Sequence, residues 1–234
     1  MVVHDPETAH ATTYAKYPVY FEVPPLPDQS LLDTVGAGTL ENFYFVGEAW
    51  AQVLHHRLPA GGTVLDIGCG CGRTARFLLL RDDIRYVGFD IFKPAIDWCT
   101  RHLAPFAKGR FRFEHLDAYS AHYNPRGRIQ STQVRFPAAD ASIDVAFAAS
   151  LFTHLLEPDA AHYLRESARC LKPGGVLVAS LHAEPPKGVK FSGREDRIDI
   201  AMDYFIGMGQ AAGLEMKEDL VSLCGQETVV FARR

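Results

Sequence analysis

The chain has 234 residues and a formal charge of −4, from 24 Lys and Arg against 28 Asp and Glu, with 47% hydrophobic and 22% charged residues. This length suits one domain, or one domain with an appendage, and the composition excludes a largely disordered or fibrous chain. The acidic balance disfavours a protein that coats nucleic acid, because such proteins carry a strong excess of cations.

Targeting signals and the spacing of the cysteines further limit the class of protein. No apolar run approaches the roughly 18 residues that a membrane-spanning helix needs, so no bilayer crossing is expected. The first residues, Met1 to Glu7, lack the cationic start and apolar core of a secretion signal, so the expected address is cytoplasmic. The five cysteines contain no C-x-x-C pair, which predicts reduced thiols and no metal site. Nothing in the sequence indicates the oligomeric state.

The N-terminal part predicts an extension of two pieces. Residues 1–30 should be irregular, an arm or lid, because prolines fix φ and remove backbone donors at Pro18, Pro24, Pro25 and Pro27. Apolar residues at helical spacing predict an amphipathic helix over 40–54. We therefore assign 1–60 to an N-terminal extension and 61–234 to the main domain. Its aromatic residues either cover an apolar ligand or anchor the extension to the core: Tyr14, Tyr17, Tyr20, Phe21, Phe43 and Tyr44.

From Thr63 onward, short apolar or β-branched runs alternate with helical stretches, a pattern typical of a parallel sheet with crossover helices. The predicted strands are 64–67, 86–90, 111–116, 143–149 and 176–181. The predicted helices are 73–80, 94–103, 158–171 and 198–212. Two closing strands, 215–222 and 227–232, are joined too closely for a parallel crossover and should pair antiparallel. The expected class is α/β.

The most informative segment is a strand that runs into three alternating glycines, Gly68, Gly70 and Gly72. Glycine lets the backbone turn sharply and approach a ligand closely, and the N–H groups at a helix start favour negative charge. A nucleotide-type cofactor is indicated, with a tight turn that binds no ligand as the alternative. The dinucleotide fingerprint would need glycine at position 73, where Arg73 stands, which weakens a nicotinamide or flavin interpretation.

The run from Asp66 to Gly72 resembles the glycine loop of class I S-adenosylmethionine-dependent methyltransferases. The resemblance continues in Gly88–Ile91, Leu116–Ala118 and Leu171–Gly175, and it covers about residues 63–181. It implies a Rossmann-like, doubly wound sheet of seven mostly parallel strands with an antiparallel last strand. It also implies S-adenosylmethionine as the cofactor.

By this resemblance the cofactor would be held at the strand ends by Asp66, Gly68, Cys69, Gly70, Gly72, Asp90, Ile91, Asp117, Ala118 and Ser150. Asp90 also has the spacing, about 20 residues on, at which a carboxylate reaches a ribose; a helix cap is its alternative role. The resemblance places Asp66 toward the cofactor's ammonium group, and Asp117 with the Ala118 N–H at the adenine. Their alternatives are a local turn cap and a surface carboxylate. Ile91, with Phe92, would be an apolar wall for the adenine or ordinary core.

The residues that would bind the methyl acceptor are less clearly marked in the sequence than those for the cofactor. His154 follows the fourth strand, where ligands of open parallel sheets bind, and its ordinary pKa near 6.5 suits a general base. A structural role is as good an interpretation, and His182 is a second candidate. Ser150 would line the methionine end through its backbone. The cations Arg126, Arg128 and Arg135 either clamp an acidic acceptor or belong to a solvated loop.

Together these features predict a methyltransferase that acts on an O, N or C nucleophile of a small molecule. Two alternatives stay open: a nicotinamide-dependent oxidoreductase on a related fold, and a protein that binds S-adenosylmethionine without catalysis. Methylation of nucleic acid is disfavoured, because Ser150–Thr153 replace the Asn/Asp-Pro-Pro-Tyr/Phe motif of base-amino methyltransferases and the net charge is negative.

Overall fold

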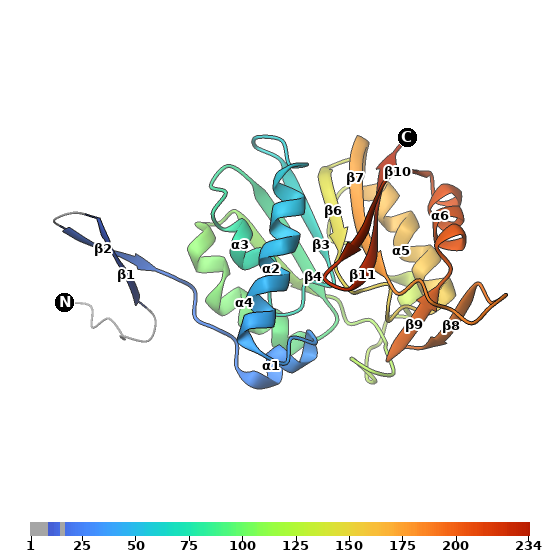
Figure 1. Ribbon diagram of the computed structural model, residues 1–234, viewed down its shortest axis with the longest axis horizontal. Helices are drawn as coiled ribbons and strands as arrows, with labels where there is room; N and C mark the ends of the chain where they lie inside the picture. Colours follow the sequence, from blue (N-terminus) through green and yellow to red (C-terminus); the bar gives the residue numbers. More distant parts are fainter. Residues whose placement is uncertain (1–8, 15–16) are drawn as a thin grey trace.

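The computed structural model describes residues 9–14 and 17–234, with side chains from residue 23 onward. Figure 1 shows a central sheet flanked by helices, with the first two strands set apart from it. In chain order the elements are β1 (Ala9–Tyr14), β2 (Tyr17–Glu22), α1 (Gln29–Thr34), α2 (Leu40–His55), β3 (Thr63–Ile67), α3 (Ala75–Leu78), β4 (Arg85–Asp90), α4 (Lys93–His102), η1 (Ala104–Ala107), β5 (Phe111–His115), η2 (Ser131–Gln133), β6 (Ile143–Ala148), α5 (Glu157–Cys170), β7 (Leu171–Leu181), β8 (Phe191–Arg194), β9 (Arg197–Ile200), α6 (Met202–Ala211), β10 (Leu214–Leu223) and β11 (Gln226–Arg233).

The main sheet has seven strands in the order β10-β11-β7-β6-β3-β4-β5. Neighbouring strands from β7 to β5 pair parallel, whereas β11 pairs antiparallel with both β7 and β10. This confirms the expected doubly wound sheet with an antiparallel last strand. The predicted strands match to within a residue at each end, except that β7 begins earlier, at Leu171.

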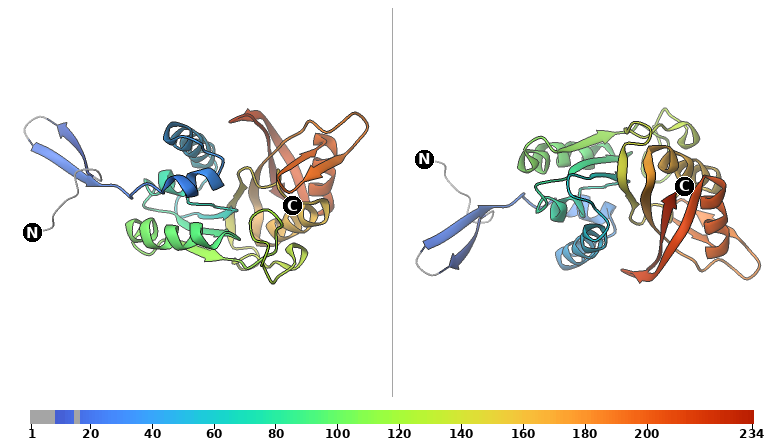
Figure 2. Two further views of the ribbon diagram at one scale, coloured as in Figure 1. Left: turned by 90° about the horizontal axis from the view of Figure 1, so that it is seen from below. Right: turned by 90° about the horizontal axis from the view of Figure 1, so that it is seen from above.

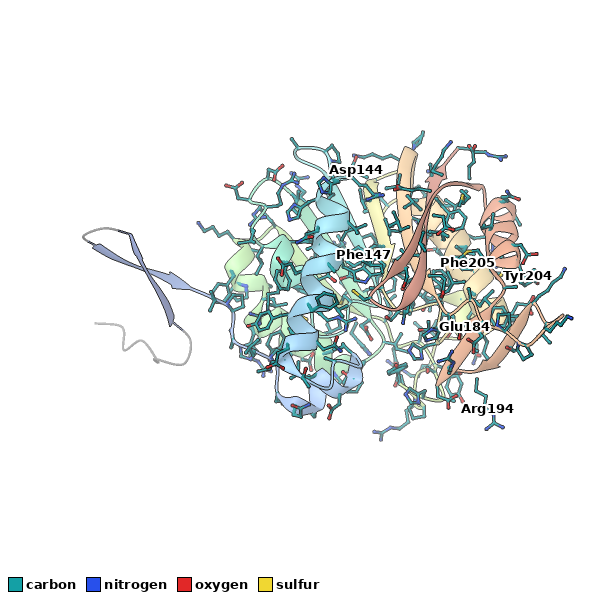
Figure 3. All side chains as sticks on the ribbon, viewed as in Figure 1. Asp144, Phe147, Glu184, Arg194, Tyr204 and Phe205 are labelled. Atoms are coloured by element: carbon teal, nitrogen blue, oxygen red, sulfur yellow. The ribbon has the colours of Figure 1, made fainter. Side chains whose placement is uncertain are left out.

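Helices cover both faces of the sheet (Figure 2). Side chains of α2, α3 and α4 share one apolar cluster with the strands, and those of α5 and α6 share another. The Trp50 ring of α2 lies 5.9 Å from Phe147 of β6, and the Phe205 ring of α6 lies 5.8 Å from Phe231 of β11. Figure 3 labels Phe147 and Phe205 on the ribbon. Helix α2, which we assigned to the extension, therefore packs into the same core as the main domain.

The prediction that residues 1–30 are irregular is wrong in two places. Strands β1 and β2 pair antiparallel with each other, with Pro18 opposite Thr13, and α1 begins at Gln29. A two-stranded sheet leaves one edge of each strand unpaired, and a proline is tolerated there. The side chains of Tyr14, Tyr17, Tyr20 and Phe21 lie outside the described part of the chain.

The rest of the extension is tied to the core by backbone and aromatic contacts. The Arg76 guanidinium donates to the carbonyl oxygens of Pro24, at 2.7 Å, and Pro25. Phe43 is buried, whereas the partly exposed Tyr44 packs its ring edge on Phe77. Both aromatics thus follow the anchoring alternative.

Two predicted helices are shorter than expected. The stretch 198–212 divides, because buried Ile198 and Ile200 alternate with polar neighbours and extend β9 beside β8; helix α6 then begins at Met202. The helix expected over 73–80 keeps regular helical geometry only over Ala75–Leu78. Within residues 9–14 and 17–234, no helix is long and apolar enough to span a membrane.

Candidate active site

A cavity of about 680 Å³ opens at the carboxyl ends of β3, β4 and β6. We name its two ends by their residues. The glycine end is lined by residues 33–36 at the end of α1, by 89–92, and by Asp66, Gly68, Cys69, Gly70, Arg73 and Thr74. The histidine end consists of 119–123, 150–159, His182 and Glu195. In a parallel sheet these strand ends lie at one edge, so the cavity stands where ligands of such folds bind.

At the glycine end, a side chain on Gly68 or Gly70 would collide with neighbouring residues. Gly68 and Gly70 have φ of 78° and 51°, in the left-handed region that favours glycine. A Cβ on Gly70 would lie 2.5 Å from Cγ1 of Val35, and one on Gly68 would lie 3.0 Å from Cδ1 of Leu151. Gly72, by contrast, lies against Leu103 of the core and is absent from the cavity lining, so its contact with a cofactor stays a prediction.

Asp90 links the end of β4 to the glycine loop. One of its carboxylate oxygens accepts the Gly70 N–H at 2.8 Å and the other accepts the Phe92 N–H at 2.8 Å. Burial raises the pKa of Asp90, while these backbone hydrogen bonds act in the opposite direction. Ile91 lines the cavity beside it, and so does Cys69 of the loop. The carboxylate therefore faces the cavity and caps the local turn at once.

Asp66 lies beneath the loop and is only 3% exposed. It accepts a hydrogen bond from the Tyr86 hydroxyl at 2.5 Å. Burial raises the pKa of Asp66 to about 8, because the charged form loses its hydration; the Tyr86 hydrogen bond lowers it. At neutral pH the carboxyl group is therefore mainly protonated, and its expected contact with a cofactor ammonium group stays a prediction.

The sequence analysis considered Arg73 only because it stands where the dinucleotide-binding fingerprint requires glycine. In the structure it lines the glycine end, and its Nη1 donates to the Val35 carbonyl oxygen at 3.1 Å. Among the described residues that line the cavity, it is the one Lys or Arg.

Asp117 and Ala118, expected at the adenine, lie outside the cavity lining. The Asp117 carboxylate accepts hydrogen bonds from Arg128, at 2.5 Å, and Asn124, at 3.3 Å. The hydrogen bond from Arg128 holds the pKa of Asp117 below its usual range. The Ala118 N–H donates to the Leu116 carbonyl oxygen at 2.8 Å. Their adenine contacts stay a prediction, which would require these partners to be exchanged for the ligand.

The histidine end is organised around His154. Its Nδ1 lies 2.7 Å from the backbone carbonyl oxygen of Glu195, and its Nε2 lies 3.3 Å from the Tyr123 hydroxyl. A carbonyl oxygen only accepts, so Nδ1 carries the hydrogen of the neutral ring and Nε2 is left as the acceptor. Burial lowers the pKa of His154, so the ring is neutral at pH 7 and its Nε2, beside the Tyr123 hydroxyl, carries no proton.

Glu195 joins two segments that are far apart in sequence. It lies in the turn between β8 and β9, and its side-chain oxygen accepts the Ser120 hydroxyl at 2.5 Å and the His122 N–H at 3.2 Å. Sequence reasoning missed this residue and Tyr123, since neither belongs to a motif. The alternation of Ile198 and Ile200 was the one signal for the hairpin that carries Glu195.

Ser150 lines the cavity in a left-handed conformation, φ 59°, directly after β6. Its N–H donates to the buried Ser180 hydroxyl and its carbonyl oxygen accepts the Thr153 hydroxyl. Both backbone groups that we expected to face a ligand therefore have partners within the protein. His182 also lines this end.

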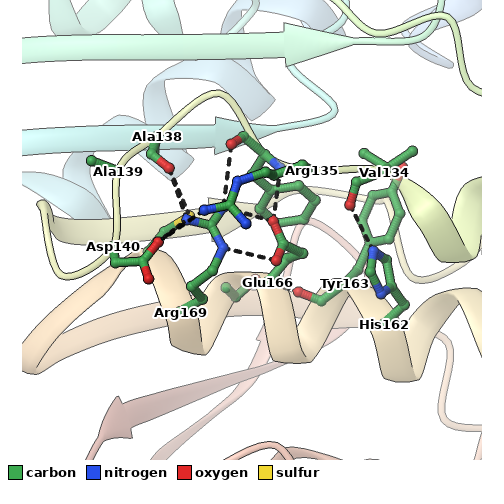
Figure 4. Close-up of polar contacts among 12 residues, drawn as sticks. Val134, Arg135, Ala138, Ala139, Asp140, His162, Tyr163, Glu166 and Arg169 are labelled. Carbon is green, nitrogen blue, oxygen red and sulfur yellow. Dashed lines mark hydrogen bonds and ion pairs between the residues drawn. The ribbon is translucent and has the colours of Figure 1, made fainter.

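The arginines of the segment after β5 do not reach the cavity. Arg128 pairs with Asp117, and Arg135 pairs with Asp140 at 3.2 Å. Asp140 also pairs with Arg169, which bonds Glu166 and the Ala138 carbonyl oxygen and so ties this segment to α5 (Figure 4). Arg126 is exposed and likewise absent from the lining. The segment follows the solvated-loop alternative.

Comparison with known proteins agrees with this site. A family model described as a methyltransferase domain matches residues 65–177. The 27-O-demethylrifamycin SV methyltransferase of Amycolatopsis mediterranei is 29% identical over 68% of this chain and 56% of its own length. Methyltransferase GfsG of Streptomyces halstedii is 30% identical over 64% of this chain and 46% of its own length. The chain thus spans about half the length of these relatives.

Solved structures share the fold at lower identity. A TehB-like SAM-dependent methyltransferase from Corynebacterium glutamicum superposes with a TM-score of 0.60 at 20% identity, covering 88% of this chain and 95% of that one. The 1,6-didemethyltoxoflavin-N1-methyltransferase of Burkholderia thailandensis, solved with S-adenosylhomocysteine, gives 0.59 at 18%, covering 97% and 98%. The nicotinamide alternative is set aside, since the family model and these relatives are methyltransferases. The family-model match over residues 65–177, the seven-stranded sheet and the glycine loop at the cavity together identify a class I S-adenosylmethionine-dependent methyltransferase domain in this chain.

Proposed function

We propose that this protein transfers the methyl group of S-adenosylmethionine to a hydroxyl oxygen of a small molecule, with His154 as the general base. The observation that carries the proposal is the orientation of His154 by the Glu195 carbonyl oxygen, which leaves Nε2 as a proton acceptor in the same cavity as the glycine loop. The names of the relatives include O-methyltransferases, which agrees with this choice of acceptor atom.

The glycine end fits the proposed cofactor. Its loop leaves a cradle that a Cβ at Gly68 or Gly70 would fill, and the carboxylate of Asp90 stands beside it, as a ribose contact requires. The cavity volume of about 680 Å³ lies within the usual range for a small-molecule site. Gly68, Cys69, Gly70 and Ile91 would then contact the nucleoside, and Asp90 would accept from its sugar hydroxyls.

The chain's own residues contribute alignment and a proton acceptor. S-adenosylmethionine supplies a methyl carbon on a positively charged sulfur, which leaves as a neutral thioether. His154 takes the proton of the acceptor hydroxyl on Nε2 as the oxygen lone pair forms the new bond to carbon. Tyr123, within hydrogen-bond reach of Nε2, would orient the incoming hydroxyl or pass on its proton. The Glu195 carbonyl oxygen keeps the ring in position throughout.

The lining also limits the acceptor. Among the described residues, the histidine end has no Lys or Arg, and it carries the carboxylates of Asp159 and Glu195. A phosphate or carboxylate on the acceptor would meet no cation there, so we infer a neutral or amine-bearing small molecule rather than a nucleic acid. The aromatic rings of Tyr123 and His154 would pack on its apolar part. A cytoplasmic address stays a prediction.

The test is a binding and turnover experiment on the same preparation. Calorimetric titration should show saturable binding of S-adenosylhomocysteine, and a panel of phenols and other neutral or amine-bearing hydroxyl compounds should yield a methylated product by mass spectrometry. Binding without methylation of any hydroxyl compound would favour the non-catalytic alternative. Methylation on nitrogen or carbon alone would overturn the choice of oxygen, and absence of binding would overturn the proposal itself.

A further inference from the structure

We infer that the side-chain carboxylate of Glu195 is a positioning group for His154, whose ring it holds from both sides through hydrogen bonds to the loop after β5. The inference rests on the proposed function and deepens it. The carboxylate acts indirectly, because the Glu195 atom on His154 Nδ1 is the backbone carbonyl oxygen, at 2.7 Å. The side chain fixes the turn that presents this oxygen.

The Nδ1 side of the ring depends on the turn between β8 and β9. Glu195 lies in that turn, and its carboxylate oxygen accepts the Ser120 hydroxyl at 2.5 Å and the His122 N–H at 3.2 Å. Both donors belong to the loop after β5, so they attach the tip of the hairpin to that loop. The hydrogen bond that sets the tautomer of His154 therefore depends on the carboxylate contact.

The Nε2 side of the ring depends on Ser120. Its hydroxyl gives its one hydrogen to the Glu195 carboxylate, which leaves the lone pairs to accept the N–H groups of His122, at 3.3 Å, and Tyr123, at 3.1 Å. These bonds hold the turn that carries Tyr123, whose hydroxyl lies 3.3 Å from His154 Nε2. One carboxylate is thus connected to the groups on both nitrogens of the imidazole.

The body of the hairpin is held independently of the Glu195 side chain. The Ile198 N–H donates to the Thr153 carbonyl oxygen at 2.8 Å. The Ile200 N–H donates to the His182 carbonyl oxygen, also at 2.8 Å, and both isoleucines are fully buried. Loss of the Glu195 side chain should therefore leave β9 in place and release only the turn at its tip.

Four variants separate the reach of the side chain from its charge. Glu195→Gln keeps an oxygen acceptor at the same distance and loses the charge, whereas Glu195→Asp keeps the charge and is one methylene shorter. Glu195→Ala loses both. Asp196→Asn is the matched control, because Asp196 is exposed, lies in the same turn and does not line the cavity.

The first readout is the tautomer of His154, measured from the ring ¹⁵N chemical shifts of labelled protein at a pH where the ring is neutral. In the wild type Nδ1 should carry the hydrogen, as its carbonyl contact requires. Glu195→Ala and Glu195→Asp should shift the ring toward the Nε2–H form, which predominates in free neutral histidine. Glu195→Gln and Asp196→Asn should keep the wild-type tautomer.

The second readout is turnover on a phenol that the wild type methylates. Glu195→Ala and Glu195→Asp should lower kcat by roughly 10- to 100-fold, because a misplaced base loses part of its effect, with an unchanged affinity for S-adenosylhomocysteine. Glu195→Gln should recover most of the loss, and Asp196→Asn should keep the wild-type kcat.

The outcomes separate the inference from the proposed function. An unchanged tautomer in Glu195→Ala, or equal shifts in Glu195→Gln and Glu195→Asp, would overturn the inference and leave the proposed function in place. A shifted tautomer with wild-type kcat would support the positioning of His154 and overturn His154 as the base. Should Glu195→Ala fail to fold, the milder Glu195→Asp decides the question by the same two readouts.

Discussion

The two ends of the cavity are built in different ways. The glycine end comes from two adjacent parallel strands, β3 and β4, and from the short loops that follow them. The histidine end joins three separate segments: the loop after β5, the turn after β6, and the β8–β9 hairpin. Its central contacts bridge Tyr123, His154 and Glu195, which lie on different loops.

This difference teaches how each end obtains its chemistry. At the glycine end, burial raises the pKa values of Asp66 and Asp90, and backbone geometry leaves room for a ligand. At the histidine end, burial lowers the pKa of His154, and the carbonyl oxygen of Glu195, 41 residues further along the chain, sets its tautomer. Variants at the first end should therefore affect cofactor binding, and variants at the second should affect turnover.

The largest effect is expected from His154→Ala. Loss of a general base should lower kcat by roughly 10²- to 10⁴-fold, with little change in the affinity for S-adenosylhomocysteine. Steady-state kinetics and calorimetry on the same variant check both halves. His162→Ala is the matched control, because His162 bonds the Val134 carbonyl oxygen outside the cavity and should keep its turnover. Equal losses of binding and turnover in His154→Ala would mark His154 as structural. They would also contradict the assignment of cofactor binding to the glycine end and of turnover to the histidine end.

Asp90→Ala tests the glycine end. We expect cofactor affinity to fall by about 1.5 to 3 kcal/mol, the range for hydrogen bonds to a charged group, with kcat at saturating cofactor much less affected. Asp90→Asn keeps an oxygen that can accept the Gly70 or Phe92 N–H, so it should lose less. Titration with S-adenosylhomocysteine measures both variants. An unchanged affinity in Asp90→Ala would remove the ribose assignment.

Asp66 gives the glycine end a pH dependence of stability. Its pKa is raised to about 8 in the folded protein from an ordinary value of 3.8. Between these values the folded state holds a proton that the unfolded state has released, so the free energy of unfolding falls as pH rises, by up to about 1.4 kcal/mol per pH unit. The contribution is fully present below 3.8 and lost by about pH 8.

Asp66→Asn removes this titration. Urea unfolding across that pH window should show the stability of the variant relative to wild type increasing with pH. Tyr86→Phe, which deletes the hydrogen bond that lowers the Asp66 pKa, should extend the decline to higher pH. A pH-independent difference between Asp66→Asn and wild type would contradict the raised pKa.

The smallest effect is expected from Arg128→Ala. Its ion pair with Asp117 is at the surface, with the Arg128 side chain 87% exposed, so stability should change by less than about 1 kcal/mol. Turnover on any acceptor should stay the same, because Arg128 does not line the cavity. A selective loss of activity on acidic acceptors would instead support the alternative from the sequence, in which Arg128 helps to bind an acidic acceptor.

The strands and the glycine loop were predictable because their signals are local. Each strand of the parallel sheet is a short apolar run, and the pattern of Gly68, Gly70 and Gly72 marks the turn that follows β3. The β8–β9 hairpin was missed because each strand has four residues, and its isoleucines also fit the helical pattern that leads into α6. Strands β1 and β2 were missed for another reason. Their segment contains proline, which usually interrupts a sheet, but an isolated pair of strands tolerates proline at its free edges.

Local sequence was therefore enough to establish the α/β class, the positions of the strands in the chain and Asp90 at the end of one of them, because apolar periodicity and glycine spacing act over a few residues. It also placed His154 at a strand end. Folding of the whole chain was needed to bring the Glu195 carbonyl oxygen to His154 Nδ1 and the Val35 carbonyl oxygen to the Arg73 guanidinium. The tautomer and the pKa of a side chain depend on neighbours that are distant in sequence, and no local pattern encodes them.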